Sequence, residues 1–210
     1  YAASPLFNPT DNKELWYRAA KANKEILDDS NGFAEKAKLL VEDYSSLWSK
    51  DNYNDATSEL IFLRRATTTT NSFEGYNFPV GLENCKGGNC PTQTLVDAYE
   101  MKDTGLRPDE LDNYDPTNPY YTTIAKNGDE KWPNWNTVPL QTYQGGLNAE
   151  PLSGGTPTGY YLKKYCQTAV DLRAGTASKT YHSWITFRFG EFYLNYAEAV
   201  YKDLGSPYAT

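Results

Sequence analysis

"RFGEFYLNYAEAV" (residues 188–200) is the stretch that predicts the fold most sharply. Its apolar side chains recur at helical spacing, so we expect a helix from Phe187 to Lys202. One side of this helix is wide and aromatic, and a helix with such a face needs another helix to cover it. The aromatic side comprises Phe189, Phe192, Tyr193, Tyr196, Ala197 and Val200.

The beginning of the chain supplies candidates for that partner. Residues 11–27 have apolar side chains with a period of 3.6, and Asp11 and Glu14 have the spacing of a capping box. Residues 33–48 repeat the helical pattern, and "PTQTLVDAYEM" (residues 91–101) predicts one or two helical turns. The predicted fold class is therefore mainly α.

The middle of the chain is expected to be rich in loops, with a few short strands. "ELIFLRR" (59–65) and "TGYYLKKYC" (158–166) read as strands, and "YYTTIAKNGD" (120–129) reads as a strand that runs into an Asn-Gly turn, while residues 66–92 read as loop. Residues 105–159 are the least regular part, with many Pro, Gly, Asn and Asp. A loop region of this length is usually either functional or disordered, and its many Tyr and Trp residues argue against disorder.

Composition narrows the classes of partner. The 210 residues carry a formal net charge of -7, and no cluster of Lys and Arg exceeds a pair, so nucleic acid binding is not expected. An acidic surface suits a neutral ligand, or solubility alone. No apolar run approaches the roughly 18 residues that a membrane-spanning helix requires.

The sequence carries no recognisable catalytic motif, and we predict no catalytic residue, no metal site and no cofactor. The single histidine, His182, excludes most His-based triads and multi-His metal sites. No GxSxG, HExxH or Walker-type loop is present. The acidic stretch 109–115 resembles a calcium loop only in composition. Two carboxylates that meet in space remain an alternative, which would make the protein a glycoside hydrolase.

Two of the three cysteines flank a glycine-rich turn, "CKGGNC" (residues 85–90). Cys85 and Cys90 can meet across this turn as a disulfide, or they can remain free thiols. A metal site would need more ligands than these two cysteines supply. The disulfide alternative would imply an oxidising compartment.

The sharpest feature of the loops is "EKWPNWNTVPLQTY" (residues 130–143). Trp132 and Trp135 flank a Pro-Asn turn and can form a flat, exposed platform. Such a platform suits the apolar face of a sugar ring, while neighbouring amide side chains bond to its hydroxyls. In the alternative interpretation, both rings cap the core beneath the loop.

Several stretches, in order along nearly the whole chain, resemble the SusD/RagB family. "DPTNPYYTTI" departs from the family pattern, in which "DPR" is followed by an aromatic residue. The most specific stretches are "PTQTLVDAYEM" and "RFGEFYLNYAEA". The others are "YAASPLFNP", "ELWYRAAKANKEIL", "DYSSLW", "ELIFLRR" and "TGYYLKKY".

The resemblance implies a SusD-like fold of tetratricopeptide-like helical pairs, an α-α superhelix, with long irregular loops and a few short strands. Residues 1–210 would be part of a single SusD-like domain. Residues 1–50 would be helical, residues 51–180 would hold the ligand-binding loops, and residues 181–210 would begin a C-terminal helical repeat. The chain resembles an internal piece of such a protein, without the signal peptide, the lipidated cysteine, the early helices and the C-terminus.

The resemblance also implies a role at the outer membrane, as a surface-exposed lipoprotein whose lipid anchor lies outside this chain. It implies glycan capture without chemistry, and delivery of the glycan to a SusC-like TonB-dependent transporter. A member of the family that captures peptides is an alternative. A purely structural subunit of the transporter complex is another.

Family glycan sites are built from loops, which directs attention to the aromatic and amide residues of residues 51–180. The first candidates for ligand binding are Trp132, Trp135 and Tyr143, and the second are Tyr76, Asn134 and Asn136. Four polar residues match the family motif near the C-terminus, and we interpret them as structural contacts between helices. These four are Arg188, Glu191, Asn195 and Glu198.

Overall fold

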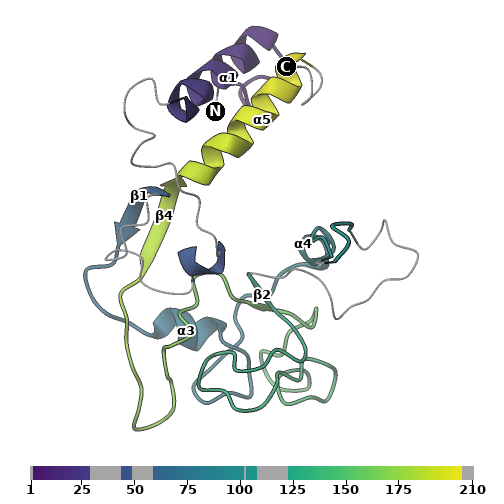
Figure 1. Cartoon of the computed structure of the whole chain (residues 1–210). Coiled ribbons are helices and arrows are strands. Elements are labelled where there is room, and N and C mark those ends of the chain that lie inside the picture. Colours follow the sequence, from purple (N-terminus) through teal and green to yellow (C-terminus); the bar gives the residue numbers. More distant parts are fainter. Residues whose placement is uncertain (1, 29–43, 49–58, 102, 108–122, 205–210) are drawn as a thin grey trace. The chain divides into compact units, whose positions relative to one another are not determined.

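The structure, a computed structural model (Figure 1), describes residues 2–28, 44–48, 59–101, 103–107 and 123–204. These residues divide into two compact units. Unit 1 contains the described residues before 29 together with 59–64 and 184–204, and unit 2 contains the others. Most of the helix predicted over residues 33–48 lies outside the described residues, as does the acidic stretch 109–115. Residues Tyr44–Leu47 form a short 3-10 helix, η1.

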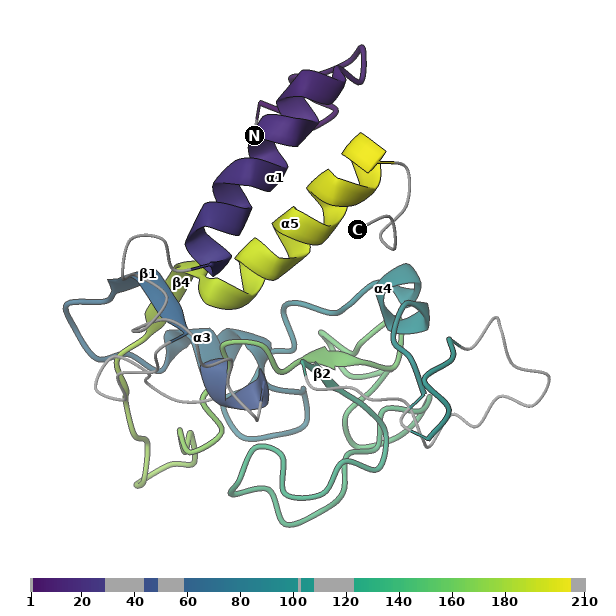
Figure 2. The ribbon, with the colours of Figure 1, turned by 45° about the horizontal axis from the view of Figure 1, so that its top comes forward.

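Unit 1 is built around two helices, α1 (Lys13–Leu27) and α5 (Phe189–Leu204), which lie side by side (Figures 1 and 2). Trp16 and Ala20 of α1 are buried together with Ala199 and Val200 of α5 in one apolar cluster. Because burial of apolar surface is the main favourable term in folding, this cluster holds the two helices together. The prediction that the last helix packs against another helix is confirmed, and α1 is that helix.

Helix α1 begins one residue later than the capping pattern predicted. Asn12, rather than Asp11, is the N-cap, and its side-chain oxygen accepts a hydrogen bond from the backbone N–H of Glu14 at 3.0 Å. Asp11 has a left-handed backbone with φ of 51°, and its carboxylate accepts a hydrogen bond from Trp16 Nε1 at 2.7 Å. The cap must reach the first free N–H groups of the helix. Because the Asp11 carboxylate binds the indole, Asn12 takes that role.

Helix α5 also begins later than predicted, because a strand precedes it. Residues Ser183–Arg188 form β4, and α5 starts at Phe189 rather than at Phe187. Strand β4 pairs with β1 (Leu60–Arg65), which confirms the strand predicted from "ELIFLRR". The segment "SWITF" is rich in β-branched and aromatic residues, as strands are. The helical periodicity that follows it obscured this signal.

The buried face of α5 is narrower than its sequence predicted. Phe189 and Val200 are buried, but Tyr193 is 46% exposed and Ala197 is exposed. Ala199, which was not assigned to the apolar side, is buried in its place.

Among the described residues, no helix has both the length and the hydropathy that crossing a membrane requires.

Unit 2 consists mostly of loops that are joined by short elements. Strands β2 (Ile124–Ala125) and β3 (Tyr161–Leu162) pair antiparallel. Two short helices, α3 (Ser72–Asn77) and α4 (Gln93–Asp97), precede them in the chain. Both strands and α4 fall in stretches predicted to form strands and helical turns. Helix α3, in contrast, lies in the segment that was expected to be loop.

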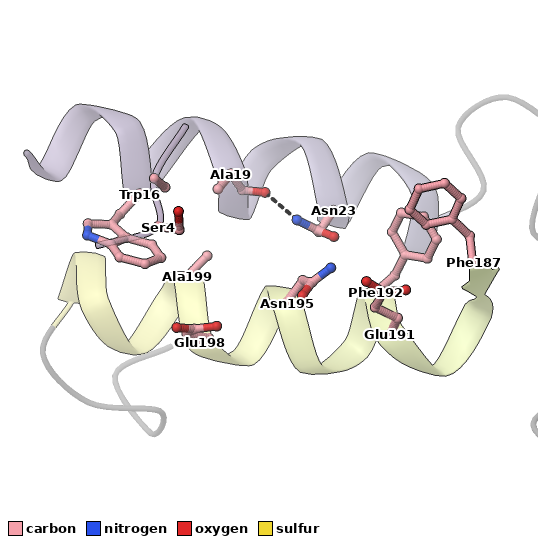
Figure 3. Close-up of a pocket in the computed structure, with 11 residues that line it drawn as sticks. Ser4, Trp16, Ala19, Asn23, Phe187, Glu191, Phe192, Asn195, Glu198 and Ala199 are labelled. Atoms are coloured by element: carbon pink, nitrogen blue, oxygen red, sulfur yellow. Dashed lines mark hydrogen bonds between the residues drawn. The ribbon is translucent and has the colours of Figure 1, made fainter. Parts of the chain in front are cut away.

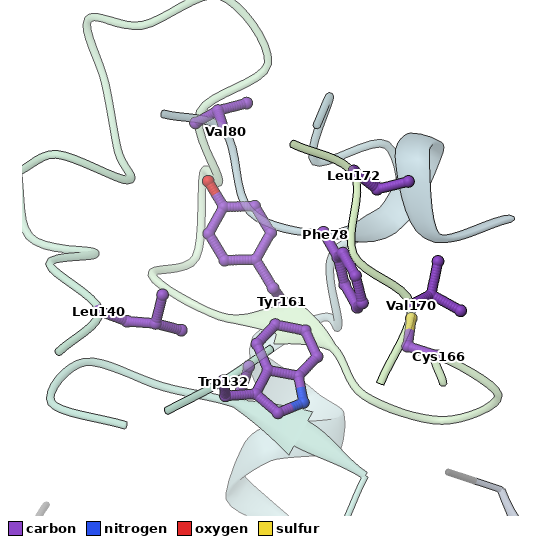
Figure 4. Packing of buried hydrophobic residues seen from close by; sticks show 9 residues of the cluster. Phe78, Val80, Trp132, Leu140, Tyr161, Cys166, Val170 and Leu172 are labelled. Atoms are coloured by element: carbon purple, nitrogen blue, oxygen red, sulfur yellow. The ribbon is translucent and has the colours of Figure 1, made fainter. Parts of the chain in front are cut away.

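The core of unit 2 is aromatic and comes largely from loops (Figure 4). Tyr161 and Phe78 are fully buried, and the ring of Trp132 meets Phe78 edge-on with the ring centroids 5.4 Å apart. The Tyr161 hydroxyl donates to the carbonyl oxygen of Asn148 at 2.7 Å and accepts from the backbone N–H of Thr156 at 3.2 Å. Its polar tip is therefore satisfied inside the core. The other members are Val80, Ala125, Leu140, Cys166, Val170 and Leu172.

The loop that carries Tyr143 is held against this core at its far end. The side-chain nitrogen of Asn148 donates to the carbonyl oxygen of Val80 at 2.7 Å. Next to it, Gly81 has a φ of 80°, and a Cβ at this position would lie 1.9 Å from the carbonyl oxygen of Leu147. Only glycine allows this approach of two backbones, so the position of the loop depends on Gly81.

The single histidine is buried in unit 2 against a carboxylate. His182 is 3% exposed, and its Nε2 lies 2.8 Å from Oε1 of Glu74, which is fully buried on α3. The same oxygen accepts a hydrogen bond from the backbone N–H of Gln167 at 3.0 Å. These contacts join α3 to two segments that lie far from it in the sequence. Because neither ionisable group reaches the surface, a ligand in solvent does not contact the pair.

The three cysteines are free thiols in this structure. The disulfide considered for Cys85 and Cys90 is not formed, and each Sγ lies near a backbone carbonyl oxygen. These distances are 3.3 Å from Cys85 to Glu83 and 3.7 Å from Cys90 to Gly87. Burial raises the pKa of the Cys85 thiol to about 12 and raises the pKa of Cys166 well above its usual value.

We expect Cys85 and Cys166 to resist alkylation in the folded protein, because the thiolate is the reactive form and their raised pKa values suppress it. Iodoacetamide at mildly alkaline pH, followed by peptide mass spectrometry, should leave both residues unmodified. The same reagent should modify both residues in concentrated guanidinium chloride, which serves as the control. Equal labelling rates with and without denaturant would contradict this expectation.

Candidate functional site

The two tryptophans that were predicted to form a platform both pack against Phe78, and they differ in exposure. Trp132 is 6% exposed, and its ring lies in the core of unit 2 against Phe78 (Figure 4). The Nζ of Lys163 lies 5.8 Å from the centroid of the same ring. The faces of Trp132 are therefore covered by the protein itself, as the core alternative described.

Trp135 remains partly exposed, and three contacts hold it, one of which is with Phe78 at 6.4 Å between the ring centroids. Its Nε1 donates a hydrogen bond to the carbonyl oxygen of Val170 at 2.8 Å. The guanidinium of Arg173 lies over its ring, 5.6 Å from the centroid. Asp171 holds this arginine at 2.7 Å, and hydrogen bonds from Arg173 lower the pKa of Asp171 to about 2. One side of the Trp135 ring is thus occupied by a cation that an ion pair holds in place.

The other residues that were predicted to bind a ligand, Asn134, Asn136 and Tyr76, also differ in their exposure to solvent. Asn134 is exposed, whereas Asn136 is 7% exposed and its side-chain nitrogen donates to the carbonyl oxygen of Trp132 at 3.2 Å. Asn136 therefore shapes the turn rather than offering its amide to solvent. Tyr76 is 57% exposed, with the Nζ of Lys86 at 4.6 Å from its ring centroid.

Tyr143 is the predicted residue that lines a cleft in unit 2. The cleft has a volume of about 310 Å³ and lies between the segment after β2, the loop that carries Tyr143 and the segment before β3. Tyr143 is 57% exposed, and the ring of Tyr160 is half-buried on the cleft wall. The lining comprises Lys126, Asn127, Thr142, Tyr143, Thr158, Gly159 and Tyr160.

Hydrogen bonds fix the walls of this cleft. The side-chain oxygen of Asn127 accepts a bond from the backbone N–H of Thr142 at 3.1 Å, which orients the amide group of Asn127. The hydroxyl of Thr158 donates to the carbonyl oxygen of Pro91 at 2.9 Å. Gly159 has a φ of 80° and carries no side chain into the space, where a Cβ would lie 3.8 Å from the carbonyl oxygen of Thr142. The shape of the cleft is therefore set before a ligand arrives.

The chemistry of the lining suits binding. An exposed aromatic ring beside hydroxyl and amide groups can stack on an apolar ring face and bond to its polar substituents. Among the described residues that line the cleft, none is Asp, Glu, His or Cys. Glycoside hydrolysis by the usual route requires two carboxyl groups beside the scissile bond, and the described lining residues include no such pair.

A larger cavity of about 430 Å³ lies in unit 1, in the groove between α1 and α5 (Figure 3). The indole of Trp16 lies near one end of the groove, and Phe187 and Phe192 lie near the other. None of the residues predicted to bind a ligand lies here. Three of the residues interpreted as contacts between helices line it, namely Glu191, Asn195 and Glu198.

Several residues of the Tyr143 cleft were missed by the sequence reasoning. Lys126 and Asn127 lie where one predicted strand runs into its turn, and Thr158 and Tyr160 lie at the start of another predicted strand. Pairing of β2 with β3 brings the two segments together. If the two predicted strands had been paired with each other, this signal would have placed these residues at one site.

Two solved structures share the fold of this chain at low sequence identity. A SusD-like protein from Bacteroides fragilis aligns with 20% identity and a TM-score of 0.65, over 96% of this chain and 43% of its own length. A SusD-like carbohydrate binding protein from the same organism aligns with 20% identity and a TM-score of 0.61, over 91% of this chain and 37% of its own. The chain therefore spans less than half the length of these proteins.

No curated protein matches the sequence significantly. The model of the SusD family matches residues 58–207, a span that includes the loops of unit 2 and the helix α5. Because this match covers most of the chain, and because the structures with the same fold are SusD-like proteins, the chain belongs to the SusD family.

Proposed function

We propose that this protein captures glycans through the cleft beside Tyr143. The observation that carries the proposal is the exposed ring of Tyr143, set beside the hydroxyl group of Thr158 and the amide group of Asn127. Aromatic stacking and hydrogen bonds to fixed polar groups together recognise sugar rings. Membership of the SusD family and a solved relative that is described as carbohydrate binding support the same ligand class.

We further propose that the captured glycan passes to a SusC-like TonB-dependent transporter in the outer membrane. In this proposal the protein is a surface-exposed lipoprotein, anchored by a lipid outside the present chain, and it releases its ligand unchanged. Family membership supports the partner and the location.

The helix pair in unit 1 is proposed to be one pair of a tetratricopeptide-like superhelix. In such repeats each pair buries its faces by stacking on its neighbours. Helix α5 still exposes Leu194, Tyr201 and Leu204, by 65%, 50% and 54% respectively. The groove between α1 and α5 is likewise open. Further helical pairs would cover both surfaces.

Replacing Tyr143 by alanine is expected to weaken glycan binding about tenfold, because a stacked aromatic contact contributes about 1.4 kcal/mol. Calorimetric titration of the full-length protein with a panel of polysaccharides and oligopeptides measures this loss. The Tyr76→Ala variant is the matched control. Tyr76 is as exposed as Tyr143, at 57%, and does not line the cleft.

The outcomes of this titration separate the alternatives. Loss of glycan binding in the Tyr143 variant alone supports the cleft. Loss in the Tyr76 variant alone would move the site to another loop. Binding of an oligopeptide but of no polysaccharide would overturn the ligand class, and release of shortened sugars would show hydrolysis.

A further inference from the structure

Lys126 gives the Tyr143 cleft a chemical preference that its other residues do not. It is the charged side chain among the described residues that line the cleft. The other lining groups are aromatic rings, hydroxyl groups, an amide and a glycine, all of them neutral. A single cation beside an exposed ring is a feature that a neutral sugar does not require.

The charge of Lys126 is only partly compensated within the protein. Its Nζ lies 3.6 Å from Oδ1 of Asp129, whereas the Nζ of Lys163 lies 2.6 Å from Oδ2 of the same carboxylate. Asp129 therefore pairs closely with Lys163 and loosely with Lys126. Two cations share one anion, so the three side chains carry a surplus of one positive charge at the cleft.

The two lysines differ in what else holds them. Lys163 lies over the ring of Trp132, a contact that faces the core. The two side chains are similarly exposed, at 25% for Lys126 and 23% for Lys163, but Lys126 follows β2 directly and lines the cleft, whereas Lys163 does not line it. Of the two cations, Lys126 is thus the one that a ligand in the cleft can reach.

We propose that the cleft selects glycans that carry an acidic group, either the carboxylate of a uronic acid or a sulfate ester, and that Lys126 binds this group. The inference rests on the proposed glycan-binding function and names its substrate class. A charge-assisted hydrogen bond from an ammonium group to such an oxygen is stronger than a neutral one. Tyr143 would stack on the sugar ring, while Lys126 would bind the acidic group that the ring carries.

The acidic balance of the whole chain does not oppose this selectivity. A net charge of -7 favours neutral ligands at long range, as its composition predicted. At physiological salt, however, exposed charges further apart than about 8 Å are largely screened from one another. The charge that lines the cleft then weighs most in the preference, and among the described lining residues this charge is the cation of Lys126.

The test compares glycans that differ only in their acidic groups. The probes are an oligogalacturonate and its fully methyl-esterified form, together with a sulfated glycosaminoglycan fragment and its desulfated form. Calorimetric titration of the full-length protein should show at least one acidic probe binding about tenfold more tightly than its neutral counterpart. The Lys126→Gln variant should remove that difference, whereas Lys86→Gln, a lysine outside the cleft, should preserve it.

Each outcome has a distinct meaning. Equal binding of each acidic probe and its neutral form, or a preference that survives in Lys126→Gln, overturns the selectivity while the glycan-binding function stands. Binding of neutral polysaccharides alone does the same. Binding of none of these glycans, acidic or neutral, overturns the proposed function and the inference together. Circular dichroism of each variant confirms that an altered affinity does not reflect unfolding.

Discussion

Replacing Arg188 by methionine is expected to lower the free energy of unfolding by about 3–5 kcal/mol, the usual cost of breaking a buried ion pair. An Nη1 atom of Arg188 contacts Oε1 of Glu59, whose side chain is only 1% exposed. Methionine has a similar volume but no charge, so the buried Glu59 carboxylate would lose its ion pair with Arg188. Removing one partner of a buried ion pair costs more than removing a surface contact, because the remaining charge stays away from water.

The backbone beside this ion pair is built to admit it. A Cβ on Gly190 would lie 2.3 Å from Nη1 of Arg188 and 3.0 Å from Oε1 of Glu59. Glycine at the first turn of α5 therefore leaves the space that the guanidinium fills. The family-like motif "RFGE" thus has a structural meaning here, because its arginine and glycine together join the start of α5 to the residue before β1.

Chemical denaturation followed by circular dichroism measures the loss in the Arg188 variant. The Glu59→Gln, Arg188→Met double variant should recover a large part of the stability, because it removes both charges. Arg173→Met is the matched control, since Arg173 pairs with Asp171 at the surface, with 48% of its side chain exposed. Surface pairs contribute little to stability. An equal loss in the Arg188 and Arg173 variants would show that burial of the pair has no special cost.

Long apolar periods made the helices predictable, while local competition between side chains decided their ends. The periodicity around Trp16 and Val200 identified α1 and α5. The start of α1, however, depends on whether Asp11 or Asn12 reaches the free N–H groups, and the indole of Trp16 decides this by binding Asp11. That contact spans five residues and is not visible in a periodic pattern.

The sequence predicted which aromatic residues belong to the loop-rich stretch, but not which of them are buried. Trp132, Trp135 and Tyr143 lie in one loop-rich stretch, and nothing in the stretch itself distinguishes their environments. Trp132 is buried because Phe78 covers it, and Phe78 lies more than fifty residues earlier in the sequence. A single sequence does not show which distant segments pack against each other. Here that packing buries Trp132 and leaves Tyr143 exposed.

The largest loss in unit 2 is expected from Tyr161→Ala, at about 3–5 kcal/mol of unfolding free energy. Tyr161 is fully buried, so its removal leaves a cavity among Phe78, Val80 and Leu140. The Tyr161→Phe variant keeps the ring and loses only the hydroxyl, which bonds to Asn148 at 2.7 Å. Its cost should be about 1–3 kcal/mol, the cost of an unsatisfied buried partner.

The same two variants connect the core to the candidate site. Residue 161 follows Tyr160, which lines the Tyr143 cleft, and the Tyr161 hydroxyl bonds to the loop that carries Tyr143. A cavity beneath this loop should therefore weaken glycan binding in Tyr161→Ala even where most of the protein remains folded. Tyr161→Phe should bind almost as tightly as the wild type. Calorimetry below the unfolding transition measures both affinities, and unchanged binding in Tyr161→Ala would show that the cleft does not depend on the core beneath it.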